Sequence, residues 1–325
     1  MRTRDHRFPV GIRSVALPVT FTPYASAQPC SARCRFCSET LVRAGLTPRL
    51  SAVLRPAEDY PEMLTRVLAA LRGLPMGLSL SGLEATDDVE WLTRALEVLD
   101  RHPFEERVLY SNAYGLYGDL ADRVVASHFD RLEISRHSAD PERNQRIMRF
   151  KAPRDFEASV RSLVQRVPIR LVCVLQRGGV EDGRTLRRYL DWARLTLGVS
   201  DIVFRELAQI DGLFRPNATE RYIKSHRVAV EDLLVETAGW NDLLPVERTE
   251  GYYFWNVRAR VGEALVTFEA SDYRQMRARH QEDRVHKLVL HADGNLTADW
   301  DPDTRVLGRF GPAHLTRSPE RRCAG

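Results

Sequence analysis

The stretch Cys30-Ser-Ala-Arg-Cys34-Arg-Phe-Cys37 places three thiols at C-x3-C-x2-C spacing, just after an apolar run and a turn rich in Pro, Ala and Ser. Cysteine thiolates are the usual ligands of iron–sulfur clusters, and such short gaps allow one loop to wrap one face of a cubic cluster. Three local ligands would leave the fourth iron open, which is what a catalytic metal centre needs. The motif therefore predicts a catalytic [4Fe-4S] cluster on Cys30, Cys34 and Cys37.

Two other chemistries also use cysteines at short spacing. A structural zinc site needs four ligands, usually in two pairs, and no Cys-x-x-Cys or Cys/His pair follows Cys37. A thioredoxin-like redox pair has no third cysteine beside it. The other cysteines are Cys173, in an apolar run, and Cys323, in a polar tail, and they are too few for a second cluster. Five cysteines in all also argue against a disulfide framework.

Length and composition are typical of a globular protein. The 325 residues are 43% hydrophobic and 28% charged, which is enough for a large core. No apolar run approaches the roughly 20 residues that span a membrane, and no signal-type apolar core follows the charged segment 1–7. We therefore expect no membrane contact and a cytoplasmic location. Only three of the 48 basic residues are Lys, and the Arg residues are interleaved with Asp and Glu. Nucleic-acid binding requires a basic stripe, so no nucleic-acid partner is expected.

Strand and helix patterns alternate from residue 14 to residue 210, which predicts parallel βαβ units. The continuous apolar strands, such as 169–176, suit strands that are buried on both faces. This pattern predicts a partial (β/α)6 TIM-like barrel, an α/β fold, over residues 1–210. The expected strands are 14–21, 77–82, 107–111, 131–135, 169–176 and 201–207, and the expected helices are 59–74, 89–99, 120–129, 141–167 with an interruption near Pro153, and 184–197.

The alternation stops after Ile210. One long helix is expected over 221–238, followed by a hairpin around Gly262 and a second around Asp293-Gly294, a strong turn signal. We expect residues 211–312 to form an α+β extension that closes the barrel mouth. The polar segment 313–325 is expected to be a disordered tail.

The cysteine loop, with the aromatic Phe36 directly before its last cysteine, resembles that of the radical SAM superfamily. The resemblance implies that the open iron holds the amino and carboxylate groups of S-adenosylmethionine (SAM). It also implies that the reduced cluster cleaves SAM to a 5′-deoxyadenosyl radical, and that an electron donor such as flavodoxin or ferredoxin is a partner.

The ends of the next strands carry further matches, in the order and spacing expected of this superfamily. Ser81-Gly82-Leu83-Glu84 resembles the Gly-Gly-Glu element that binds the SAM amino group, with Leu83 in place of the second Gly. Ser111-Asn112-Ala113 is similar to the Thr-Asn-Gly element at the ribose side. Glu133-Ile-Ser135 is similar to the Ser-Leu-Asp element that contacts ribose or carboxylate, and Glu133 and Ser135 share a strand face. Plain strand-to-helix turns remain an alternative.

Polar groups in the fifth and sixth strands are candidates for the substrate side. Gln176 ends the fifth strand, and Arg205-Glu206 lie within the sixth, where charges are not buried unless they are paired. Arg205 is either a clamp for a substrate or SAM carboxylate or part of an ion pair that fills the barrel. Cys173 is either a small core residue or a hydrogen-atom donor. The aromatic segment 252–255 either lines the substrate pocket or packs in the core.

The sequence shows no cysteine-rich tail for auxiliary clusters and no further module. It therefore looks most like stand-alone, single-cluster members that act on small polar metabolites in specialised metabolism such as antibiotic biosynthesis. The resemblance favours decarboxylation of a sugar or nucleoside, as in the cytosylglucuronate decarboxylase group. Alternatives are an epimerase or dehydrogenase of an aminoglycoside-like substrate, and a peptide- or RNA-modifying enzyme. A metal-binding regulatory barrel is the alternative outside the enzymes.

The cluster assignment predicts that anaerobic reconstitution gives about four irons per chain. The triple variant Cys30→Ala, Cys34→Ala, Cys37→Ala should retain almost none, because it lacks every local thiolate. Iron analysis and the visible absorption of the cluster measure the cluster content of the wild type and of the triple variant. A triple variant that still binds a full cluster would show that the assignment is wrong.

Overall fold

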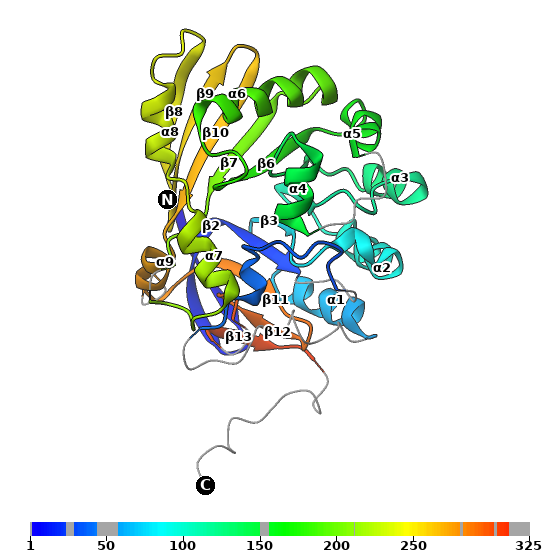
Figure 1. Cartoon of the computed structure of the whole chain (residues 1–325). Coiled ribbons are helices and arrows are strands. Elements are labelled where there is room, and N and C mark those ends of the chain that lie inside the picture. The colour runs from blue at the N-terminus through cyan, green and yellow to red at the C-terminus, as the bar shows by residue number, and fades with distance from the viewer. Residues whose placement is uncertain are drawn as a thin grey trace.

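The computed structural model describes residues 2–23, 29–43, 58–149, 156–210, 212–279, 282–301 and 304–311 (Figure 1). The predicted tail at 313–325, Cys323 and the helix interruption at Pro153 lie outside these residues. No helix in this part of the chain is long and apolar enough to cross a membrane.

The predicted fold class is confirmed, because six parallel strands follow one another in an open, TIM-like arc. The strands are β2 (Gly11–Pro23), β3 (Met76–Leu80), β4 (Glu106–Ser111), β5 (Arg131–Ser135), β6 (Ile169–Leu175) and β7 (Asp201–Glu206). Between them lie α1 (Tyr60–Ala70), α2 (Val89–Leu99), α3 (Gly118–Ala126), α4 (Pro141–Met148), α5 (Phe156–Val164) and α6 (Gly183–Trp192), which continues into a π-helical turn, Ala193–Leu197.

The connecting helices form because their apolar residues recur at helical spacing and face the sheet. In α2, the Asp88 carboxylate accepts a hydrogen bond from the Trp91 backbone N–H at 3.0 Å and thereby caps the helix. Leu92, Leu96 and Leu99 of the same helix are fully buried against the strands. Burial of a leucine side chain contributes about 1.5–3 kcal/mol, so packing rather than helix propensity holds these short helices in place.

The chain after residue 210 continues this sheet on both of its edges. β10 (Ala264–Ser271) pairs in parallel with β7, and β11 (Arg284–Leu290) pairs in parallel with β2. Eight parallel strands therefore form the arc, and it does not close into a barrel. The outer strands are antiparallel: β9 (Phe254–Val261) and β8 (Leu243–Glu250) beside β10, β12 (Asn295–Thr297) and β13 (Val306–Arg309) beside β11, and β1 (Arg2–Phe8) beside β2.

Both predicted hairpins are present, but the predicted helix over 221–238 is two helices, α7 (Ala218–His226) and α8 (Val230–Thr237). The chain turns between them because distant groups bind the backbone there. The backbone N–H of Arg177 donates to the carbonyl of His226, and the Glu206 carboxylate accepts from the N–H of Val230. A short helix, α9 (Tyr273–Arg279), follows β10. Only part of the extension reaches the cysteine loop: the Thr219 and Thr40 hydroxyls are 2.6 Å apart. Closure of the mouth stays a prediction.

Successive residues of the arc strands face opposite sides, and the two sides differ in chemistry. The side covered by helices is apolar: Leu132, Ile134, Leu171 and Phe204 are fully buried there. The inner, concave side instead carries charged residues such as Arg170, which pairs across the sheet with Glu133 and Asp201. The helix-covered side therefore supplies the core, and the inner side and the strand ends are left for chemistry.

The turn between β11 and β12 provides a test of the fold. Gly294 has φ +83°, and a Cβ on it would overlap the backbone nitrogen of Gly311. Gly73 has nearly the same φ, +80°, with nothing within 4 Å of such a Cβ. We expect Gly73→Ala to cost about 1 kcal/mol from backbone strain alone, and Gly294→Ala at least about 2 kcal/mol more. Urea unfolding measures both. Equal losses would mean that Gly311 does not pack on this turn.

Candidate active site

The cysteine loop lies across the carboxyl ends of the strands, where backbone contacts hold it. The backbone N–H groups of Arg33 and Arg35 donate to the carbonyls of Met148 (2.8 Å) and Ile147 (3.2 Å), at the end of α4. The loop then turns through the short 3-10 helix Ser38–Thr40. Active sites of parallel α/β barrels lie at this end of the strands, so the loop has the position that the sequence predicts.

The three cysteines of the loop form no disulfide bond and are half-buried. Burial, together with the nearby Cys37 side chain, raises the pKa of Cys34 to about 12, and burial and the nearby Glu84 raise that of Cys30. Such thiols lose their protons readily only to a metal, which stabilises the thiolate. In the described residues no three His, Cys, Asp or Glu side chains converge as ligands of one metal ion. Thiolates of a cubic cluster bind different irons, so this loop suits a cluster better than a single ion.

Glu84 connects the loop, the end of β3 and the end of β4. Its Oε1 accepts hydrogen bonds from the Thr86 hydroxyl (2.6 Å) and the Ser111 hydroxyl (2.8 Å), and its Oε2 accepts from the Asn112 backbone N–H (2.6 Å). The Asn112 amide in turn donates to the Ser31 hydroxyl at 2.9 Å and lies 3.9 Å from the Cys30 sulfur. Burial raises the pKa of the Glu84 carboxyl, although these hydrogen bonds oppose the rise.

The two positions where the superfamily elements have Gly keep a glycine-like backbone here. Leu83 has φ +49° and Ala113 has φ +64°, in the left-handed region that glycine adopts without strain. Gly82 beside Leu83 has φ +99°. An L-residue pays about 1–2 kcal/mol for this conformation. Both strand ends therefore turn through a backbone conformation that glycine adopts without strain, although neither residue is a glycine.

Ser135 and Gln176 lie at the ends of the next two strands, and Phe36 packs against His137, two residues after Ser135. Ser135 is half-buried at the end of β5. Gln176 is fully buried, and its side-chain oxygen accepts from the Tyr222 hydroxyl of α7 at 2.8 Å. The rings of Phe36 and His137 meet edge to face, with centroids 5.0 Å apart. Gln176 thus links β6 to α7 and is less open to a ligand than the sequence predicts.

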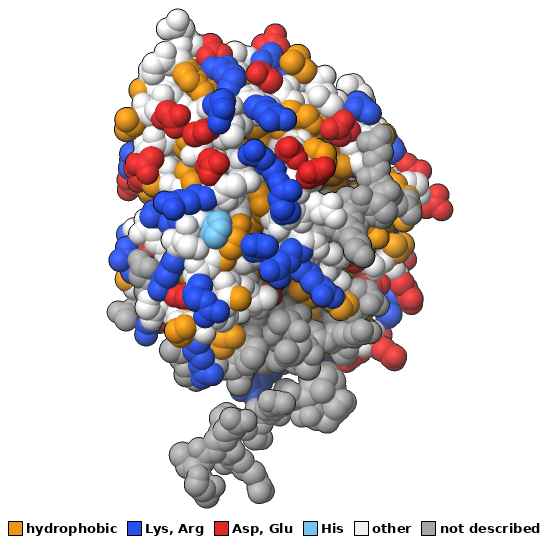
Figure 2. Space-filling model, in the orientation of Figure 1, with side chains coloured by type: hydrophobic (Ala, Val, Ile, Leu, Met, Phe, Trp, Pro, Cys, Tyr) orange, Lys and Arg blue, Asp and Glu red, His pale blue; other side chains and the backbone are white. Residues whose placement is uncertain are grey.

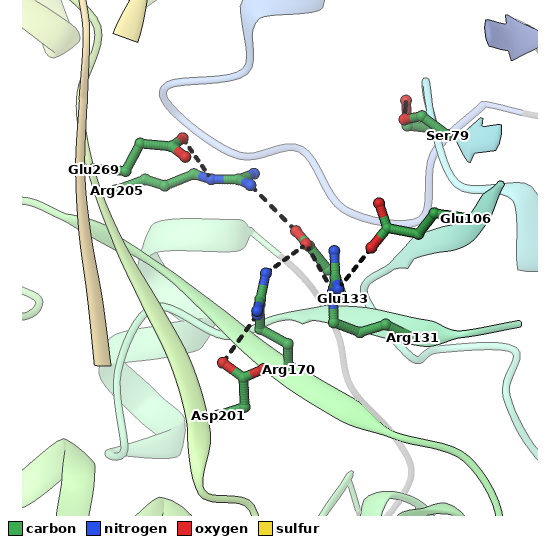
Figure 3. A network of polar contacts seen from close by, with 9 residues as sticks. Ser79, Glu106, Arg131, Glu133, Arg170, Asp201, Arg205 and Glu269 are labelled. Atoms are coloured by element: carbon green, nitrogen blue, oxygen red, sulfur yellow. Dashed lines mark hydrogen bonds and ion pairs between the residues drawn. The ribbon is translucent and has the colours of Figure 1, made fainter. Parts of the chain in front are cut away.

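An ionic network covers the inner side of β5, β6 and β7. Arg131, Arg170 and Arg205 all point at the buried carboxylate of Glu133, at 3.3, 3.5 and 3.2 Å (Figure 3). Arg205 also pairs with Glu269 of β10 at 3.0 Å. Burial works against the Arg205 charge, but the surrounding carboxylates raise its pKa overall. Arg205 is therefore held between two carboxylates, which favours the ion-pair interpretation over a carboxylate clamp, and Glu133 belongs to this network.

Glu206 and Cys173 do not face the inner side, because residues next to each other in a strand point to opposite faces. Glu206 instead pairs with Arg227 and accepts from the Val230 N–H at 2.8 Å, at the start of α8. Cys173 is fully buried among the helix-side apolar residues, and burial raises its pKa. These positions favour structural roles for both residues, and the catalytic roles predicted for them stay untested. Glu206 anchors α8, and Cys173 is a core residue.

The structure adds two residues that the sequence patterns do not single out. Asp87 accepts the Ser31 backbone N–H at 2.5 Å, and its other carboxylate oxygen is buried without a hydrogen-bond partner in the described residues. His137 accepts the Val174 backbone N–H on Nδ1 at 3.0 Å and is buried behind Phe36. Neither lies in a recognisable motif. The acidic run after Glu84 is the sequence signal for Asp87, and His137 has none.

No family model matches the sequence, and no curated protein sequence matches it. The fold is a partial TIM-like barrel. Escherichia coli coproporphyrinogen III oxidase (HemN), described as a radical SAM enzyme, matches with a TM-score of 0.39 at 12% identity, over 75% of this chain and 64% of that chain.

More similar is Streptococcus suis SuiB, crystallised bound to S-adenosylmethionine (TM-score 0.54) and bound to the precursor peptide SuiA (0.55). Both comparisons cover 92% of this chain and 64% of SuiB at 12% identity. The chain therefore shares the fold of SuiB and spans less than two thirds of its length.

His137 makes stability depend on pH. Burial, together with the charge of Arg136, lowers its pKa to about 3, so the folded protein keeps it neutral while the unfolded chain protonates it below about pH 6.5. Stability is therefore lost as pH falls, by about 1.4 kcal/mol per pH unit below 6.5. Urea unfolding at about pH 7 and about pH 5.5 should show this loss, and His137→Gln should reduce it. If the stability of His137→Gln depends on pH as strongly as that of the wild type, His137 is not the source of the pH dependence.

Proposed function

We propose that this chain is a radical SAM enzyme that holds one [4Fe-4S] cluster on Cys30, Cys34 and Cys37. The observation that carries the proposal is the hydrogen-bonded chain from Cys30 through Asn112 to Glu84, which joins the loop to the strand ends. It brings the Cys30 end of the loop close to the residues that resemble the SAM-binding elements. The fold of SuiB, a protein crystallised with SAM, supports the same assignment.

We propose that SAM lies across these strand ends, in contact with Gly82, Glu84, Asn112 and Ser135. When bound, cluster and SAM supply a 5′-deoxyadenosyl radical. The Glu84 Oε2 accepts one backbone hydrogen bond and has room for another from an ammonium group. Asp87 offers a second carboxylate oxygen close by.

For the substrate, we propose first a small polar molecule such as a sugar, nucleoside or amino sugar, bound against the inner side of the arc. This side carries charges and hydroxyl groups rather than an apolar pocket. Arg205 is already paired twice, so it orders this surface instead of gripping a substrate carboxylate. Decarboxylation therefore needs another group to recognise the carboxylate. Cys173 is not placed to serve as the hydrogen-atom donor of an epimerisation, because it faces the helices and not the inner side of the arc.

A peptide substrate is the second candidate, and two observations favour it. SuiB, which shares the fold, was crystallised bound to a precursor peptide. Among the described residues, β10 and β11 also share no hydrogen-bonded ladder, and stacking of the Tyr252 and His286 rings, with centroids 4.5 Å apart, joins the β9 side to β11. A gap that side chains bridge without such a ladder suits a chain that passes across the inner surface.

The site assignment predicts that Glu84→Ala weakens SAM binding. Loss of a charge-assisted hydrogen bond to the bound amino group costs about 1.5–3 kcal/mol, which corresponds to about one to two orders of magnitude in Kd. Isothermal titration calorimetry of the reconstituted protein with SAM measures this change in Kd.

The matched control is Asp88→Ala, which removes the cap of α2 a few residues away without touching the loop. It should lower stability by about 1 kcal/mol and leave the Kd for SAM unchanged. Unchanged SAM affinity in Glu84→Ala would remove Glu84 from the site. Equal losses in the two variants would mean that Glu84 acts only through the fold.

A further inference from the structure

The proposed function, on which this inference rests, needs one electron for each reductive cleavage of SAM. That electron has to enter through the protein surface nearest to the cysteine loop. The structure should therefore show, beside the loop, a surface that a carrier protein can occupy.

Five arginines on the cysteine loop, at the end of α4, after β6 and on α7 form no ion pair among the described residues. Two of them flank Cys34 in the sequence and are exposed while Cys34 is half-buried. Nearby carboxylates are already used, since Glu142 pairs with Arg146 and Glu220 pairs with Lys224. We call these five residues the basic face: Arg33, Arg35, Arg149, Arg177 and Arg221.

Contacts place the basic face on one side of the molecule. The end of α4, which holds the loop, is followed directly by Arg149. The Arg35 guanidinium lies over the Tyr222 ring of α7, 5.7 Å from its centroid. Burial raises the pKa of Tyr222, and the charges of Arg35 and Arg149 both oppose that rise, so both stand near it.

The turn after β6 completes the basic face. The backbone N–H of Arg177 donates to the carbonyl of His226 at the end of α7, at 2.9 Å. Figure 2 shows Lys and Arg side chains gathered over the part of the surface where α4 and α7 lie in Figure 1. The arginines that are spread evenly along the sequence therefore converge in space.

We propose that the basic face docks an acidic one-electron carrier protein, with a flavin or iron–sulfur centre, over Cys34. One electron passes from the reduced carrier to the cluster, and the carrier is oxidised by one electron. Unpaired guanidinium groups attract an acidic partner and speed its association. The cations surround the loop rather than the inner side of the arc, where carboxylates accompany every arginine of the network. This position suits an electron donor better than an anionic substrate such as RNA.

The test compares two double charge reversals in the full, reconstituted protein. Arg149→Glu/Arg177→Glu alters the basic face but leaves the cysteine loop intact. Arg72→Glu/Arg101→Glu is the matched control, because both residues are exposed and precede β3 and β4, at the opposite ends of the strands. The probe is oxidised flavodoxin, titrated by calorimetry at low and high salt, and a short single-stranded RNA serves as the competing polyanion.

We expect the basic-face variant to bind flavodoxin at least about tenfold more weakly than the wild type, equivalent to about 1.4 kcal/mol, and to lose most of the salt dependence. The control should stay within about twofold. Reduction of the cluster by flavodoxin hydroquinone should slow in the basic-face variant alone, whereas dithionite, a small reductant, should reduce all three proteins equally.

Equal flavodoxin binding by the two variants would overturn the docking proposal. So would loss of RNA binding in the basic-face variant with flavodoxin binding unchanged, which would assign the face to a nucleic acid. Iron content and SAM affinity are measured in the same samples. If the wild type holds neither cluster nor SAM, the proposed function fails, whereas retention of both with unchanged flavodoxin binding overturns docking alone.

Discussion

Glu84 accepts hydrogen bonds from Thr86, Ser111 and Asn112, and this buried carboxylate fixes the strand ends on which the candidate site is built. Burial of an isolated carboxylate costs several kcal/mol, which these donors offset. Asn112 extends the arrangement to the cysteine loop through Ser31. The group that would accept the SAM ammonium under the proposed function is therefore also one that orders the strand ends. A single carboxylate would serve both roles because its two oxygens offer about four acceptor positions.

Strand alternation divides the charged residues by role. Arg205 faces the inner side and joins the network around Glu133, while its neighbour Glu206 faces the helices and anchors α8. Breaking a buried pair by removing one partner costs about 3–5 kcal/mol when the other charge stays buried. Buried charged residues of this kind therefore contribute to stability as well as to chemistry. Arg205 and Glu206 are neighbours in the sequence, but in the folded chain they belong to two separate sites on opposite faces of the sheet.

The sequence predicts the βαβ core and the cysteine loop well, because both depend on local periodicity and spacing. It does not predict β1 or β8, since Arg2–Phe8 and Leu243–Glu250 are mostly exposed and polar, and only pairing with β2 and β9 makes them strands. The break between α7 and α8 also depends on distant partners, Arg177 and Glu206. At the site, the motif positions are readable in the sequence, but the position of Asp87 beside Ser31 and that of His137 behind Phe36 depend on three-dimensional contacts.

The parallel pairing of β11 with β2 has a consequence for synthesis of the chain. Ser14 pairs with Arg284, so one edge of the strand that leads into the cysteine loop has no partner until most of the protein has left the ribosome. At typical elongation rates this delay is on the order of tens of seconds. An unpaired strand edge is a template for wrong association. A nascent chain of this topology therefore keeps this edge exposed until late in synthesis, and a cluster held by the loop would be loaded after the edge is covered.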